Sequence, residues 1–165
     1  MICDGVSEDL NVGTRDGLNL QASPPPVLVV LDTNIVLDLW LYRDPATPDL
    51  QAALSGKSVQ WLATQVMRDE LERVLAYTHI ARRLAFSALT AEDILRQFDA
   101  HAVLQPIAPK ALFICKDGDD QKFIDLAAQL KAQLISKDKA VLTMRNRMAR
   151  LGVAVAKRFP AVLPV

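Results

Sequence analysis

The stretch Val27-Leu28-Val29-Val30-Leu31-Asp32-Thr33-Asn34 is the most informative part of this sequence. Its first five residues are all apolar, and most of them are β-branched. Such a run predicts a strand that is buried on both faces, as in a parallel sheet covered by helices on either side. Asp32 then marks the carboxyl end of this strand.

Short apolar runs recur along the rest of the chain, with helical stretches between them. They lie at residues 59–63, 111–115, 133–136 and 153–156, and residues 101–105 are a further, shorter candidate strand. Thr90-Ala91-Glu92-Asp93 is a capping signal that opens a helix toward Phe98. Strands that alternate with helices predict a three-layer α/β/α fold around a central, mostly parallel sheet.

The chain divides into an N-terminal tail and a folded body. Residues 1–26 contain three glycines and the run Pro24-Pro25-Pro26, with little apolar periodicity, so we expect a loosely held tail. Residues 27–165 are then one folded domain, which is long enough to bury a sizeable core.

Composition places the protein among soluble globular domains. Hydrophobic residues are 51% of the chain and charged residues 23%. Cys3 and Cys115 do not form a disulfide framework, which favours a reducing, cytoplasmic compartment. No stretch is long and apolar enough for a membrane span, so no membrane partner is expected.

The formal net charge is zero, but the charges are unevenly distributed. Residues 27–130 contain fourteen acidic and ten basic side chains, whereas residues 131–165 contain Asp138 as their single acid. The basic residues of this last segment are Lys131, Lys137, Lys139, Arg145, Arg147, Arg150, Lys157 and Arg158. The split indicates a basic face beside an acidic site, although solvated helix faces alone would also produce it.

Two aspartates follow predicted strands. Asp32 comes directly after the first strand, and Asp138 follows the run at residues 133–136. In open α/β sheets, binding sites form at the carboxyl ends of the strands, so both positions are candidate site positions. The alternative is that each aspartate caps the helix that follows it.

Glu70 lies on a predicted helix from about residue 65 to residue 77. Met67, Leu71, Val74, Leu75 and Thr78 share one face of this helix at helical spacing. Glu70 falls on the margin of that face, whereas Asp69 and Glu72 point toward water. A carboxylate at the edge of the core needs a partner, and Arg68 or Arg73 could supply it instead of a metal.

A third acidic motif, Asp117-Gly118-Asp119-Asp120, precedes a predicted helix with Phe123, Leu126, Ala127 and Leu130 on its apolar face. Asp119 suits the helix cap, while Asp120 lies on the inward side. Asp125 is expected to project outward and is excluded from the site. Taken alone, the three acids could also be a simple polar loop.

The joint pattern is more informative than any single acid. Four carboxylates at strand ends and inward helix margins, Asp32, Glu70, Asp120 and Asp138, would converge on one pocket. Such a cluster is tolerable only if a cation neutralises it. Oxygen ligands without a Cys or His cluster favour Mg²⁺ or Mn²⁺, and His79 and His101 are interpreted as structural.

These motifs together resemble the PIN-domain family. The resemblance rests on Val-Val-Leu-Asp-Thr-Asn, the acidic residue of the Glu70 helix, Cys-Lys-Asp-Gly-Asp-Asp-Gln-Lys-Phe-Ile-Asp-Leu-Ala and Leu-Ile-Ser-Lys-Asp, and it spans roughly residues 27–165. It implies that Asp32, Glu70, Asp120 and Asp138 are the catalytic and metal-binding acids. It further implies that Asp117 is an auxiliary acid and that Asn34 supports Asp32. Lys137 departs from the family, which often has threonine or glycine near this position.

The resemblance also implies an activity. The implied reaction is metal-dependent hydrolysis of RNA, leaving a 3′ hydroxyl and a 5′ phosphate. The similar branch of the family contains toxins of bacterial toxin–antitoxin pairs, so an antitoxin partner and a homodimer are expected. The candidates for contacting the RNA backbone are Lys137, Lys139, Arg145, Arg147 and Arg150.

Two other functions are compatible with an α/β domain of this kind. The first is a non-catalytic RNA-binding or assembly module that retains the fold, although the intact set of acids argues against it. The second is a receiver-type phosphoacceptor domain. That class expects an acidic pair after the first strand, where this chain has Asp32 alone.

Overall fold

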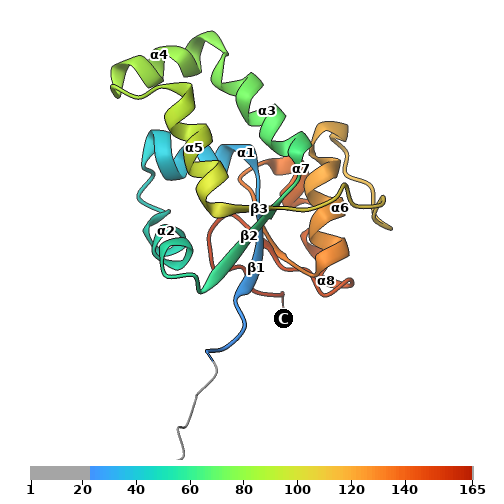
Figure 1. The fold of residues 1–165 in the computed structure, drawn as a ribbon. Coiled ribbons are helices and arrows are strands. Elements are labelled where there is room, and N and C mark those ends of the chain that lie inside the picture. Colours follow the sequence, from blue (N-terminus) through green and yellow to red (C-terminus); the bar gives the residue numbers. More distant parts are fainter. Residues whose placement is uncertain (1–22, 165) are drawn as a thin grey trace, which may run out of the picture.

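A parallel β-sheet organises the chain. The computed structural model describes residues 23–164, and within them a five-stranded sheet has the order β3-β2-β1-β4-β5, with every neighbouring pair parallel (Figure 1). The strands are β1 (Val27–Leu31), β2 (Val59–Ala63), β3 (Ala102–Leu104), β4 (Gln133–Ile135) and β5 (Val155–Ala156). The prediction of an α/β fold around a parallel sheet is therefore confirmed.

Helices connect the strands. They are α1 (Thr33–Leu37), the π-helix η1 (Asp38–Tyr42), α2 (Pro48–Ser55), α3 (Gln65–Leu75), α4 (Thr78–Phe86), α5 (Ala91–His101), the 3₁₀-helix η2 (Gly118–Asp120), α6 (Gln121–Leu130), α7 (Lys139–Leu142) and α8 (Arg145–Ala149). The predicted capping box at Thr90 is confirmed, since its hydroxyl accepts from the backbone of Asp93 and the Asp93 carboxylate accepts from the backbone of Thr90. None of these helices is long and apolar enough to cross a membrane.

The order of the strands creates a crevice at the centre of the sheet. β1 pairs with β2 on one side and with β4 on the other, so the winding direction reverses between β1 and β4. Ligands of doubly wound sheets bind at this switch point, outside the carboxyl ends of the strands. The order also contradicts the receiver alternative, because receiver domains have the order 2-1-3-4-5.

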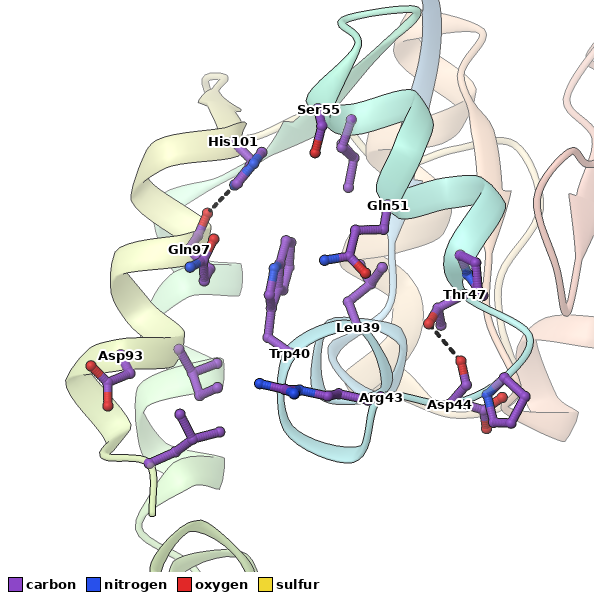
Figure 2. A pocket seen from close by; sticks show the side chains of 15 residues that line it. Leu39, Trp40, Arg43, Asp44, Thr47, Gln51, Ser55, Asp93, Gln97 and His101 are labelled. Carbon is purple, nitrogen blue, oxygen red and sulfur yellow. Dashed lines mark hydrogen bonds between the residues drawn. The ribbon is translucent and has the colours of Figure 1, made fainter. Parts of the chain in front are cut away.

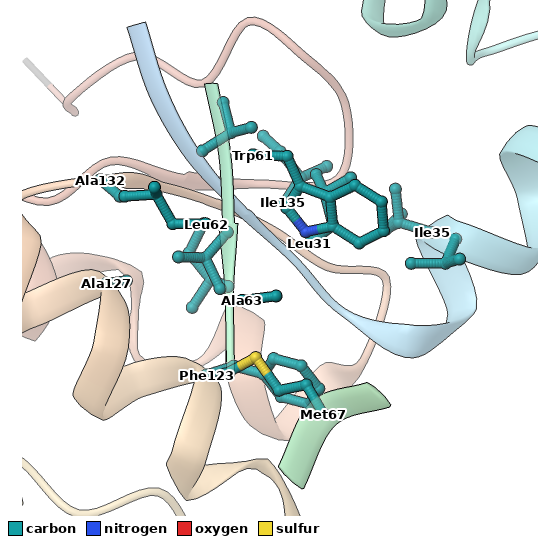
Figure 3. Packing of buried hydrophobic residues seen from close by; sticks show 14 of the residues in the cluster. Leu31, Ile35, Trp61, Leu62, Ala63, Met67, Phe123, Ala127, Ala132 and Ile135 are labelled. Carbon is teal, nitrogen blue, oxygen red and sulfur yellow. The ribbon is translucent and has the colours of Figure 1, made fainter. Parts of the chain in front are cut away.

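The core lies on both faces of the sheet. Val29, Val30 and Leu31 of β1 are almost fully buried, as the uninterrupted apolar run predicted. Figure 3 shows Trp61 and Ile35 on one side of β2 and Leu62 and Ala127 on the other. On the side of Trp61, its ring stacks on Trp40 of η1 and meets Phe98 of α5 edge-on. On the side of Ala127, α6 packs against β1 and β4. These helices position the loops that follow the strands.

One predicted strand is wrong. Residues 111–115 form an irregular segment, and the third strand is β3, which lies within the shorter candidate at residues 101–105. Side chains of α6 hold this segment: the Asp125 carboxylate accepts from Ala111 N at 2.8 Å, and the Gln121 amide bonds both Phe113 O and Cys115 N. Leu112 and Ile114 are 76% and 56% exposed, so the run does not bury its apolar side chains as a central strand would.

The same contacts correct the prediction for Asp125. Its side chain is buried and accepts a second hydrogen bond, from the Gln121 amide at 2.8 Å. The irregular segment crosses the face of α6 that helical periodicity assigned to solvent. Asp125 is therefore a structural residue of that contact.

The N-terminal tail falls largely outside the described residues. Residues 1–22, which include Cys3, are not among them, so the division between tail and body at residue 26 stays a prediction. Cys115 is buried and free.

Candidate functional site

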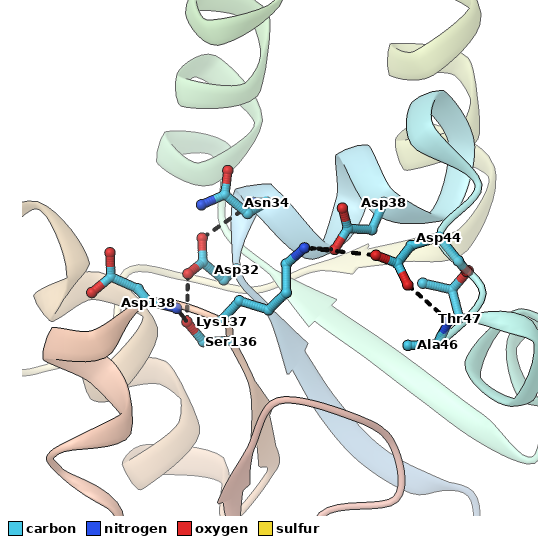
Figure 4. Close-up of polar contacts among 9 residues, drawn as sticks. All are labelled: Asp32, Asn34, Asp38, Asp44, Ala46, Thr47, Ser136, Lys137 and Asp138. Carbon is cyan, nitrogen blue, oxygen red and sulfur yellow. Dashed lines mark hydrogen bonds and ion pairs between the residues drawn. The ribbon is translucent and has the colours of Figure 1, made fainter.

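Asp32 lies at the carboxyl end of β1 and begins α1. Its backbone N–H continues the sheet by donating to Ile135 O at 3.0 Å, so the position of the residue is fixed by strand pairing. The side chain is only 4% exposed; Oδ1 accepts from Asn34 N at 3.3 Å and Oδ2 accepts from the Ser136 hydroxyl at 2.6 Å (Figure 4). Burial raises the pKa of Asp32, although these hydrogen bonds oppose the shift.

Ser136 joins the two strand ends. It directly follows β4 and is fully buried. Its hydroxyl donates to Asp32 and accepts from the backbone N–H of Asp138 at 3.0 Å, so one side chain fixes two acidic positions. Sequence reasoning missed Ser136. The signal in the sequence was a polar residue at the end of the apolar run. The register, in which Leu31 pairs with Ile135, then places Ser136 beside Asp32.

Asp138 begins α7. Its Oδ1 accepts from Ala140 N at 2.7 Å, so the helix-cap interpretation is correct for this aspartate, as it is for Asp32. The cap uses one carboxylate oxygen of each residue. Capping and a role in the site are therefore compatible, and the two interpretations offered by the sequence are not exclusive.

Glu70 projects from α3 toward the same strand ends. The Thr33 hydroxyl donates to Glu70 Oε1 at 2.7 Å, and Lys122 of α6 forms an ion pair with the other oxygen. The predicted arginine partners are wrong. Arg68 instead pairs with Asp99 of α5 through two hydrogen bonds, of 2.6 and 2.8 Å, and Arg73 forms no ion pair within the described part of the chain.

Asp120 is the least satisfied of the four acids. It begins α6, yet its side chain makes no capping hydrogen bond, and its Oδ2 is buried without a hydrogen-bond partner among the described residues. Burial, followed by the negative charges of Asp138, Asp32 and Asp117, raises the pKa of Asp120 to about 7. This carboxylate is held where its own negative charge is costly.

The cap of this loop was assigned to the wrong residue. Asp117, not Asp119, begins η2, and its Oδ1 accepts from Asp119 N at 3.0 Å. Asp119 is exposed, and its backbone carbonyl accepts from the Lys122 ammonium. Asp117 is also exposed, so it acts on Asp120 through its charge.

A pocket of about 340 Å³ brings the four acids together. Asp32, Glu70, Asp120 and Asp138 all line it, although they come from four separate segments of the chain. Asn34 lines it too, and its contribution to Asp32 is its backbone N–H. The rim includes Tyr42, Tyr77 and His79, which sequence reasoning did not place here. His79 therefore lies at the site, and its interpretation as structural stays a prediction.

The acidic residues suit a hard divalent cation. Within residues 23–164, no group of three or more His, Cys, Asp or Glu side chains is arranged closely enough to hold an ion as it stands, and Lys122 engages Glu70. The partnerless Asp120 oxygen and the mutual repulsion of Asp32, Asp120 and Asp138 nevertheless leave negative charge unneutralised. Oxygen donors of this kind fit Mg²⁺ or Mn²⁺.

The predicted RNA-contacting residues do not line this pocket. Lys137 extends away from it, as Figure 4 shows, and pairs with Asp38 at 2.5 Å and with Asp44 at 3.9 Å. Lys137 therefore links the strand end to η1 and the loop after it. Lys139, Arg145, Arg147 and Arg150 are exposed on and after α7 and α8, and their role stays a prediction.

A second cavity, of about 510 Å³, lies between η1, α2 and α5 (Figure 2). Trp40, Gln51 and His101 line it. His101 is structural, as predicted, since its Nδ1 bonds Gln97 O at 2.9 Å and its ring lies 5.4 Å from that of Trp40. Two carboxylates also line this cavity, Asp44 and Asp93, and both accept backbone hydrogen bonds.

Comparison with known families identifies the fold. A family model described as a PIN domain matches residues 28–140, which is more than half of the chain and includes all four pocket acids. The chain belongs to the PIN-domain family. PIN domains are generally nucleases, and the acidic pocket lies at the strand ends where a doubly wound sheet binds its ligand. No curated protein matches the chain.

Proposed function

We propose that this PIN-domain protein is an endoribonuclease that depends on Mg²⁺ or Mn²⁺. The observation that supports the proposal most directly is the pocket lined by Asp32, Glu70, Asp120 and Asp138. One of its buried carboxylate oxygens has no hydrogen-bond partner within residues 23–164, and the pKa of that aspartate, Asp120, is raised to about 7. A site with this much uncompensated negative charge is suited to bind a cation.

In this proposal the chain's own residues have distinct roles. Asp32 and Asp120 would be the principal metal ligands, and Glu70 and Asp138 would complete the site. When bound, the cation would supply Lewis-acid stabilisation of charge on the scissile phosphate. Ser136 and Thr33 orient Asp32 and Glu70 through their hydroxyl groups.

We propose Asp138 as the base that takes the proton of the attacking water. Its Oδ1 is used by the helix cap, so Oδ2 is the oxygen that can accept a proton from the attacking water. The water oxygen forms a bond to phosphorus while the bond from phosphorus to the 3′ oxygen breaks. The leaving 3′ oxygen takes up a proton from solvent water, and the proton on Asp138 returns to solvent, which gives a 3′ hydroxyl and a 5′ phosphate.

RNA is the proposed substrate. Tyr42, Tyr77 and His79 form the rim of the pocket, where rings can stack on unpaired bases. Lys139, Arg145, Arg147 and Arg150 would contact the phosphate backbone. The resemblance to toxins supports the further proposal that the protein acts in a toxin–antitoxin pair, with an antitoxin partner and as a homodimer.

Cleavage of RNA tests this proposal. Purified protein is incubated with a labelled single-stranded RNA in Mg²⁺, in Mn²⁺ and in chelator, and the ends of the products are analysed. We expect cleavage with either metal, none in chelator, and 5′ phosphate ends. RNA binding without cleavage under any condition would instead support the non-catalytic alternative, which the Glu70–Lys122 ion pair favours because it occupies one of the acids.

A further inference from the structure

Lys122 places a positive charge beside the acidic pocket, on the carboxylate of Glu70, which lines it. It is the second residue of α6, and its ammonium reaches across to the Glu70 carboxylate on α3. The side chains of Lys122 and Glu70 are only 22% and 18% exposed. The ammonium also donates to Asp119 O and lies 5.0 Å from the centre of the Phe123 ring, so several contacts fix its position.

Within the described residues, Glu70 differs from the other three acids of the pocket because it forms an ion pair. Asp32, Asp120 and Asp138 form no salt bridge there, and Glu70 has Lys122 as its partner. The positive charge of Lys122 acts on Asp120 against the repulsion from its acidic neighbours. A half-buried ammonium without a partner would be costly, so its place here depends on the surrounding carboxylates.

We infer that Lys122 is the internal counter-ion of the acidic pocket: it holds the metal-free site together and must release Glu70 when a divalent cation binds. The inference rests on the proposed metal site. A tethered cation competes with a free one for the same carboxylate. Lys122 therefore sets how tightly the metal binds, and it lets the protein fold without a metal despite its clustered acids.

The first experiment replaces Lys122 and follows two properties. In chelator, Lys122→Met should lower the melting temperature by about 5 °C, because the carboxylates lose their counter-ion. Titration with Mn²⁺, followed by electron paramagnetic resonance, should show binding about 3- to 10-fold tighter in Lys122→Met, corresponding to a coupling of about 0.7–1.4 kcal/mol. Lys122→Arg keeps the charge and should stay near wild type in both.

Lys116→Met is the matched control. Lys116 is exposed in the segment just before η2 and has no ion pair among the described residues, so its loss should change neither property. Equal effects of both methionine substitutions would contradict the inference, because they would show that only the loss of one positive charge matters and not its position beside Glu70. Weaker Mn²⁺ binding in Lys122→Met would contradict the inference, since it would mean that Lys122 prepares Glu70 for the metal.

A double-mutant cycle between Lys122→Met and Glu70→Gln tests the release of Glu70. In chelator, the double variant should melt well above the temperature expected if the two losses added, because both substitutions break the same pair. In saturating Mn²⁺ this coupling should vanish. Coupling that persists there would overturn the inference. Wild type that binds no Mn²⁺ would overturn the proposed function, and intact coupling in chelator would then show a permanent ion pair.

Discussion

The acidic pocket and the cavity beside Trp40 differ in how their carboxylates are satisfied. The cavity is the larger, about 510 Å³ against about 340 Å³. Its two acids are satisfied: Asp44 accepts from Ala46 N at 2.8 Å, and Asp93 accepts from Thr90 N at 2.8 Å. In the smaller pocket, Asp120 has a buried oxygen that finds no hydrogen-bond partner in the described part of the chain.

The acidic pocket is distinguished from the larger cavity by its unsatisfied carboxylate charge and not by its volume. A hydrogen-bonded carboxylate stabilises the loop that contains it and needs no ligand. A carboxylate whose pKa is raised by burial and by like charges costs folding free energy, and a bound cation would remove that cost. The acidic pocket is therefore the functional candidate, and the cavity is a space between packed helices.

The largest difference between the two regions should appear in catalysis. Asp32→Asn keeps the shape of the side chain and removes the charge, so metal-dependent RNA cleavage should fall at least about 100-fold, more than is typical for the loss of a residue that merely supports a ligand. Asp44→Asn, in the cavity, should change the rate less than about twofold, since the contacts of Asp44 with Ala46 N and Lys137 lie outside the acidic pocket. Initial rates on one RNA substrate compare the variants, and similar losses in both would contradict the distinction.

A smaller effect is expected from Ser136→Ala. The hydroxyl of Ser136 orients Asp32 and also accepts from Asp138 N, so its loss should weaken Mn²⁺ binding about 10- to 100-fold. Ser58→Ala is the control, because the Ser58 hydroxyl donates only to Ala53 O, at the opposite end of the sheet. Calorimetric titration with Mn²⁺ measures both. Unchanged affinity in Ser136→Ala would show that Asp32 needs no support.

A smaller effect is expected in the pH dependence of the free energy of unfolding, and it should depend on Asp120 in the acidic pocket. The pKa of Asp120 is raised to about 7 from 3.8, so the folded state favours the protonated form. The stability that this provides is complete below about pH 4 and is lost as the pH rises toward about 7. In chelator, Asp120→Asn should therefore gain over wild type by about 5 °C at pH 7.5 and by little at pH 4.5. A gap that does not change with pH would contradict the assignment.

The smallest effect is predicted for the cavity. Arg43→Ala and Gln51→Ala remove polar side chains that line it but lie outside the acidic pocket. Both variants should cleave RNA within about twofold of wild type and bind Mn²⁺ equally well. A selective loss of activity in these variants would show that the cavity takes part in substrate binding.

Much of the fold could be predicted because its signals are local. The run from Val27 to Leu31 is apolar throughout, as is typical of a strand buried on both faces, and the capping box at Thr90 lies within four consecutive residues. Asp32 and Asp138 could be predicted for the same reason, because both lie at the end of an apolar run. Asp32 directly follows β1, and Asp138 lies between β4 and α7.

The failures concern contacts between distant segments. The run at residues 111–115 has the composition of a strand, but Gln121 and Asp125 bond its backbone in place of a neighbouring strand. The helical period places Asp125 on the outer face of α6, where the covering segment cannot be seen from the sequence. The partner of Glu70 is Lys122, 52 residues further along the chain. The sequence suggests Arg68 or Arg73 as the partner because these residues are near Glu70 along the same helix.

The central claim is that four carboxylates share one pocket that holds a divalent cation. Matched melting curves of wild type and Asp120→Asn, in chelator and in Mn²⁺ at pH 7.5, test it without any substrate. Compared with wild type, Asp120→Asn should melt higher in chelator, because it relieves repulsion, and lower in Mn²⁺, because it binds the ion less tightly. A variant that melts at or below wild type in chelator, with the same gain from Mn²⁺, would contradict this claim.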